Sequence, residues 1–137
     1  MKWEKSCGAV IFKKDNNSVK VLLLRHRAGH WSFSKGHVEK DESEVDTAIR
    51  ELKEEVNLDI SINNDFRKSI CYNVKENVRK EVIYFLCFID DISNIKIDNK
   101  EIIDMGWYSI EDAFLKITYN EDKEVLKEAS NYIKYNL

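Results

Sequence analysis

Short apolar runs separated by polar turns dominate the first half of the chain, a pattern that predicts strands joined by tight connections. The runs at 7–13 and 19–25 flank the turn-forming cluster Asp15-Asn16-Asn17-Ser18, so we expect a β-hairpin there. Residues 34–42, with a glycine at Gly36, are expected to form a loop. Other strands are expected over 31–33, 67–74, 81–89 and 105–109.

After Gly36 the apolar period changes to that of a helix. Ser43 is placed to cap the helix, and Asp46 three residues later completes a pattern like a capping box. Asn57 lies where a residue that tolerates the left-handed backbone ends a helix. We therefore predict a helix over 44–56. Its apolar stripe consists of Val45, Ala48, Ile49, Leu52 and Val56.

The rest of the chain predicts two more helices, over 110–117 and 121–135. No proline, Gly/Ser linker or repeat interrupts the sequence, so we expect one domain over residues 1–137. Strands and helices mixed in this order favour an α/β layered fold with a mixed sheet.

Composition and charge narrow the classes of partner. The chain has 25 acidic and 22 basic residues, so its net charge of -3 favours neither nucleic acid nor an anionic membrane as a partner. No segment has the length or apolar character of a membrane span or a secretory signal, and we expect a cytoplasmic protein. Cys7, Cys71 and Cys87 have no spacing typical of a zinc site or a disulfide framework, and we expect buried free thiols.

The predicted helix over 44–56 gathers carboxylates on the face beside its apolar stripe. At about 100° per residue, Glu51, Glu54 and Glu55 lie close together and repel one another unless something neutralises them. Such an acidic face is often only solvated surface. The alternative is a divalent cation, for which Mg²⁺ is the natural candidate and Mn²⁺ a possible replacement.

The spacing around this helix decides between the two interpretations. The residues match eight of the nine specified positions of the Nudix box, G-x5-E-x7-R-E-U-x-E-E-x-G-U, where U is a bulky aliphatic residue. Only Asn57 departs from it, in place of glycine, and it affects the end of the helix alone. The chain thus resembles the Nudix hydrolases. The matching positions are Gly36, Glu42, Arg50, Glu51, Leu52, Glu54, Glu55 and Leu58.

That resemblance implies a Nudix α/β/α sandwich with a mixed sheet, and metal-dependent hydrolysis of a nucleoside diphosphate linked to another group. It implies that Glu54 and Glu55 bind the metal, and that Glu51 is a ligand or the general base. Arg50 is expected to hold these glutamates by charge-assisted hydrogen bonds. Glu42 is expected to pair within the loop and helix, or to bind the metal through water.

Two further candidates for the metal site lie outside the helix. The resemblance implies that the Gly36 carbonyl faces the metal. It also matches Glu101 to a glutamate on a late loop that serves as an additional ligand or base, with Asp104 as the nearby competitor. An ordinary exposed glutamate is the alternative interpretation of Glu101.

The flanks of the box resemble one branch of the family, the asymmetric diadenosine tetraphosphate hydrolases. Residues 31–39 are similar to the stretch W-x-x-P-K-G-H-V-E of that branch, except that Ser34 replaces the proline. The resemblance implies that Lys35 contacts substrate phosphate and that Tyr84 stacks on adenine. Each also has a structural alternative, an exposed lysine and a core tyrosine. The other candidate substrate contacts are His30, His37, Arg79 and Lys80.

For this branch the reaction is attack of water on one phosphorus of diadenosine tetraphosphate, giving ATP and AMP. The partner is then a small nucleotide, and the oligomeric state stays open. The same core also fits an RNA 5′ pyrophosphate, an oxidised deoxynucleoside triphosphate, or an inositol or phosphoribosyl pyrophosphate. A second class of function is a non-catalytic module that only binds a nucleotide. The retained acidic cluster argues against that class, because a binder does not need it.

Overall fold

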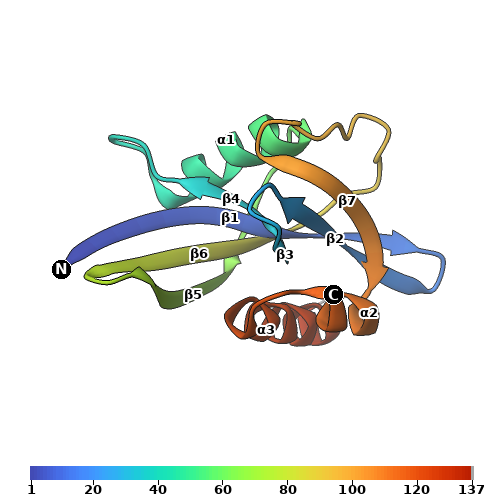
Figure 1. The fold of residues 1–137 in the computed structure, drawn as a ribbon. Helices are drawn as coiled ribbons and strands as arrows, with labels where there is room; N and C mark the ends of the chain where they lie inside the picture. The colour runs from blue at the N-terminus through green and yellow to red at the C-terminus, as the bar shows by residue number, and fades with distance from the viewer. Residues whose placement is uncertain (137) are drawn as a thin grey trace.

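The computed structural model describes residues 1–136 and shows a mixed sheet with helices on both faces (Figure 1). Helix α1 (Glu44–Val56) covers one face, and helices α2 (Ile110–Lys116) and α3 (Asn120–Asn136) cover the other. The expected α/β/α sandwich is confirmed. The strands are β1 (Lys2–Asp15), β2 (Ser18–His26), β3 (Trp31–Ser32), β4 (Ser34–His37), β5 (Asn63–Lys75), β6 (Val78–Phe88) and β7 (Ile102–Ser109).

Strand β1 lies at the centre of the seven-stranded sheet, whose main order is β3-β2-β1-β6-β5. Along one edge β1 pairs in parallel with β6. Along its other edge it pairs antiparallel first with β4 and then with β2, while β7 pairs with β2. The β1–β2 hairpin confirms the turn expected at residues 15–18, where Asn16 adopts a positive φ of 59°.

Strand alternation divides the buried side chains into two cores. Ala9 and Ile11 point toward α1, whereas Val10 and Phe12 point toward α2 and α3. On β6, Tyr84 belongs to the α3 side. Alternate side chains of β6 therefore face α1 on one side of the sheet, or α2 and α3 on the other.

Helix α1 begins and ends where the sequence predicts, because both ends are fixed by local hydrogen bonds. The Ser43 hydroxyl accepts a hydrogen bond from the Asp46 backbone N–H at 3.0 Å. Asn57 takes the left-handed conformation, with φ 60°, and its N–H bonds to carbonyls of the last turn. Leu52 and Val56 of the apolar stripe are fully buried on the sheet. The caps and the buried stripe thus fix the position of the helix, and with it the positions of its carboxylates.

Two expectations are wrong in detail. Residues 34–37, expected in a loop, form β4, because their backbone pairs with β1 in the register Ser34 opposite Ala9. Cys71 is exposed on β5, although its neighbours are apolar, while Cys7 and Cys87 are buried as expected. Within residues 1–136, no helix has the length and apolar character needed to cross a membrane.

We expect Glu44→Gln to destabilise the fold by about 1 kcal/mol near pH 7, as measured by urea unfolding. The Glu44 carboxylate accepts two hydrogen bonds from Arg67, at 2.8 and 2.9 Å, and contacts the Lys5 ammonium at 2.6 Å. The Arg67 bonds, with Lys5, lower the pKa of Glu44 from 4.5 to about 2.

A carboxyl whose pKa is lowered by folding stabilises the fold above its unfolded pKa, and this stabilisation is lost as the pH falls through the folded pKa. The difference between wild type and Glu44→Gln should therefore shrink between pH 4.5 and 2. If the difference in unfolding free energy between the two proteins did not depend on pH, it would not come from the ionised Glu44 carboxylate. Glu124→Gln, an exposed change on α3, is the control.

Candidate active site

The three glutamates of α1 lie in different environments. Glu51 and Glu55 are 7% and 2% exposed, whereas the side chain of Glu54 is 55% exposed. Burial raises the pKa of Glu51 and raises that of Glu55 to about 8. The sequence predicts that the three share one helix face, but it does not predict that the carboxyl groups of Glu51 and Glu55 are buried.

Arg50 connects these acids to the preceding loop. Its Nε and Nη2 donate to the two oxygens of Glu42 at 2.6 and 3.0 Å. Nη1 donates to Glu51 at 2.9 Å and to Glu54 at 3.1 Å, and Nη2 also donates to the His37 carbonyl at 2.9 Å. The Arg50 bonds hold the pKa of Glu42 at about 2. Glu42 thus pairs within the loop and helix, the first of its two predicted roles.

Glu55 turns toward β4 instead of Arg50. Its Oε1 accepts hydrogen bonds from the Ser34 hydroxyl at 2.7 Å and from the Lys35 backbone N–H at 3.0 Å. A proline at position 34 could not donate this side-chain bond. Ser34 is therefore a residue of the candidate site that sequence reasoning treated only as a departure from the family pattern.

Gly36 lies against the carboxylate of Glu51. A Cβ built at Gly36 would overlap all three atoms of the Glu51 carboxyl group, so only glycine permits this approach. Carboxylate oxygens and a main-chain carbonyl are the donors that Mg²⁺ prefers, and the donor set therefore fits a divalent cation. Within residues 1–136, no three acidic, histidine or cysteine side chains converge as they would around a bound ion. The ligand assignments accordingly remain predictions.

We expect Gly36→Ala to lower kcat/KM by about 10- to 100-fold, because the new methyl group displaces the Glu51 carboxylate by an ångström or more. Thermal unfolding should change little, since the carboxylate can rotate toward the surface. Steady-state kinetics and a melting curve on the same sample test this expectation. Unchanged kcat/KM would show that the position of Glu51 does not matter for turnover.

A cavity of about 550 Å³ lies next to β4, on the α3 side of the sheet. Its lining includes His30 and two of the predicted phosphate-binding residues, Lys35 and Lys80. Burial, together with the nearby Lys35 ammonium, lowers the pKa of Lys80 to about 8. Burial also lowers the pKa of His30, whose ring stacks on His26 at 4.6 Å between ring centroids. The cavity is thus basic along one side.

Other side chains of this cavity were missed by sequence reasoning. Tyr72 and Tyr119 line it from β5 and from the residue preceding α3. Asp122, in the first turn of α3, lines it as well. No sequence signal marked them beyond the predicted strand of Tyr72 and the predicted helix of Asp122, because β5 and the start of α3 meet at the cavity only after folding.

The structure separates some predicted residues from this cavity. Tyr84 is fully buried and packs edge-on against Phe33, with 5.2 Å between ring centroids, so the prediction that it stacks on a base is wrong. Arg79 does not line the cavity, but it donates to the lining residue Asn73 at 3.0 Å and lies over the Trp3 ring. That Arg79 reaches substrate phosphate stays a prediction.

His37 and Glu101 do not line this cavity. His37 is exposed at the end of β4, and burial of part of its ring lowers its pKa. Glu101 is exposed just before β7, and its charge contributes to raising the pKa of Glu51. Its proximity to Glu51 is compatible with the predicted role of an additional ligand or base.

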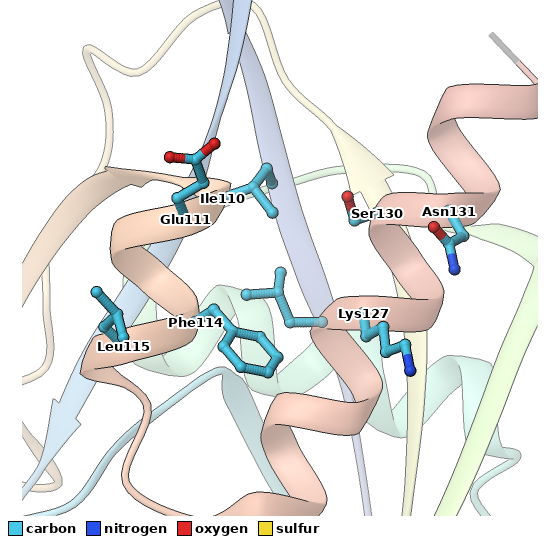
Figure 2. A pocket seen from close by; sticks show the side chains of 8 residues that line it. Ile110, Glu111, Phe114, Leu115, Lys127, Ser130 and Asn131 are labelled. Atoms are coloured by element: carbon cyan, nitrogen blue, oxygen red, sulfur yellow. The ribbon is translucent and has the colours of Figure 1, made fainter.

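A second hollow, of about 430 Å³, lies between α2 and α3 (Figure 2). Phe114 and Leu115 project from α2, while Lys127 and Asn131 project from α3. None of the predicted site residues lines it. We therefore take the cavity beside Lys35 and the glutamate face of α1 as the candidate active site.

Comparisons with known proteins agree with this geometry. A family model described as the NUDIX domain matches residues 3–129. The pig bis(5′-nucleosyl)-tetraphosphatase [asymmetrical] is 32% identical over 140 residues, covering 94% of this chain and 95% of the relative. A crystal structure of a Caenorhabditis elegans Ap4A hydrolase binary complex superposes with a TM-score of 0.88 at 30% identity, covering 96% of this chain and 98% of that one. The fold and the glutamate helix define a hydrolase of phosphoanhydride bonds. The chain belongs to the Nudix family.

Proposed function

We propose that this protein hydrolyses diadenosine tetraphosphate to ATP and AMP in the presence of Mg²⁺. The observation that carries the proposal is the direct link between the cavity and the glutamates. The backbone N–H of Lys35 binds Glu55, while the Lys35 side chain lines the cavity together with Lys80. A polyphosphate bound by these lysines would therefore lie next to the carboxylates of α1.

The cavity also offers surfaces for a nucleoside. Tyr72 and Tyr119 place aromatic side chains in the same hollow as the two lysines. Aromatic rings bind nucleobases by stacking, and ammonium groups attract phosphate. Tyr72 lies opposite Lys80 in the β5–β6 pairing, so the two kinds of contact are neighbours in the sheet. This combination fits a nucleoside polyphosphate.

The metal would be held by Glu51, Glu54 and Glu55 with the Gly36 carbonyl. When bound, Mg²⁺ supplies positive charge beside the phosphate oxygens, which favours in-line attack by water. In this proposal, Arg50 orients two of the glutamates through its fork of donors. One glutamate, with Glu51, Glu54 and Glu101 as the candidates, orients the water and takes its proton. Lys35 offsets charge that develops on the phosphate.

A substrate panel with Mg²⁺ tests the choice of substrate. It should contain diadenosine tetraphosphate, 8-oxo-dGTP, ADP-ribose, an inositol pyrophosphate and a 5′-triphosphorylated RNA, with Glu55→Gln as the blank. We expect the highest kcat/KM for diadenosine tetraphosphate. A higher value for another compound would contradict the substrate while leaving the family chemistry intact. No turnover of any compound would favour the nucleotide-binding module.

A further inference from the structure

The side chain of Asp122 is an unusual component of the nucleotide cavity. It is 5% exposed, yet it lines the hollow together with Tyr72 and Tyr119. A carboxyl group loses much of its hydration in such a place, and burial raises the pKa of Asp122. An acid of this kind needs hydrogen-bond donors around it.

Only one of its oxygens has a donor among residues 1–136. Oδ2 accepts a hydrogen bond from the Ser32 hydroxyl at 2.8 Å, which ties α3 to β3. No hydrogen bond to Oδ1 is present among these residues. The neighbouring hydroxyl of Tyr84 is likewise buried without a hydrogen-bond partner in the described part of the chain. Of the two groups, only Asp122 lines the cavity, and its carboxylate has unused hydrogen-bonding capacity.

We propose that Asp122 is a specificity-determining residue that accepts a hydrogen bond from the exocyclic amino group of an adenine base held in this cavity. The inference rests on the proposed function, since it requires a nucleotide in the hollow. The two tyrosines supply ring surfaces, which every base can use, and so they do not discriminate between bases. A single buried acceptor beside them discriminates, because a base without a donor leaves the carboxylate unpaired.

The size of the effect follows from the charge of the acceptor. A hydrogen bond to a charged group typically changes affinity by about 10- to 100-fold. Purine riboside 5′-triphosphate is the matched probe, because it has the sugar, phosphates and purine ring of ATP but lacks the amino group. Comparing the two ligands cancels the contributions of Lys35 and Lys80 to phosphate binding.

The experiment is isothermal titration calorimetry of both triphosphates with the full chain carrying Glu55→Gln. This substitution is expected to prevent hydrolysis of the ligands during the titration. With Asp122 present, we expect ATP to bind about 10- to 100-fold more tightly than the analogue. In Asp122→Ala the ratio should fall to within about threefold, and Asp122→Asn should lie between the two. A melting curve of each variant establishes that it is folded.

Ser32→Ala is the matched control, since it breaks the bond between Ser32 and Asp122 but keeps the carboxylate. The ATP preference should survive in this variant. Its loss in Ser32→Ala and Asp122→Ala alike would overturn direct recognition and leave Asp122 as a tether of α3. Equal binding of both ligands with Asp122 present would overturn this inference alone. Binding of neither would overturn the proposed function as well.

Discussion

Glu55→Gln is expected to lower the turnover of the preferred substrate by at least about 100-fold, as loss of a catalytic metal ligand does. Glu54→Gln should have an effect of the same size. The two residues differ in exposure, so a shared loss of activity would reflect a shared chemical role. Steady-state kinetics at saturating Mg²⁺ measure this effect.

Stability separates this chemical role from damage to the fold. Glutamine keeps the shape of Glu55 and its capacity to accept from Ser34, and it removes a buried acid whose pKa burial raises to about 8. We therefore expect the melting temperature of Glu55→Gln to stay the same or rise. Glu124→Gln, on the exposed face of α3, should change neither property. Wild-type turnover in both Glu54→Gln and Glu55→Gln would contradict a metal site on α1.

Arg50→Ala is expected to lower both activity, by about 100-fold, and stability, by about 2 kcal/mol. The guanidinium group is the common partner of Glu42, Glu51 and Glu54 and of the His37 carbonyl. Its removal leaves three acids without their counter-charge, two of them partly or largely buried. Kinetics and urea unfolding measure the two losses.

Arg50→Lys tests whether geometry or charge matters. A lysine keeps the positive charge but has no planar fork to serve several acceptors at fixed angles. We expect it to recover part of the stability and little of the activity. Full recovery of activity would show that Arg50 acts only by its charge, and not by orienting the glutamates.

The local parts of this molecule could be predicted from its sequence. Helix α1 matches its predicted range because Ser43 and Asn57 fix its ends through bonds to nearby backbone groups. The glutamate face follows from helical geometry and from the spacing of the family motif. Strand β4 was missed because its pairing with distant β1, and not its own four residues, makes it a strand.

The cavity beside Lys35 could be predicted only in part. Lys35 belongs to the motif and could be predicted, whereas Tyr72 on β5 meets Tyr119 and Asp122 at the start of α3 only in the folded chain. Tyr84 was assigned to the substrate by its match to the family. The alternation of β6 instead points Tyr84 into the core below α3, where packing against Phe33 covers its ring.

If the glutamate face of α1 and the neighbouring cavity form one site for diadenosine tetraphosphate, the protein cleaves that compound asymmetrically, to ATP and AMP. Ion-exchange chromatography of diadenosine tetraphosphate incubated with Mg²⁺ and either wild type or Glu55→Gln tests it most directly. We predict equal amounts of ATP and AMP from wild type and almost none from the variant. Two molecules of ADP per substrate, or equal product from both proteins, would contradict it.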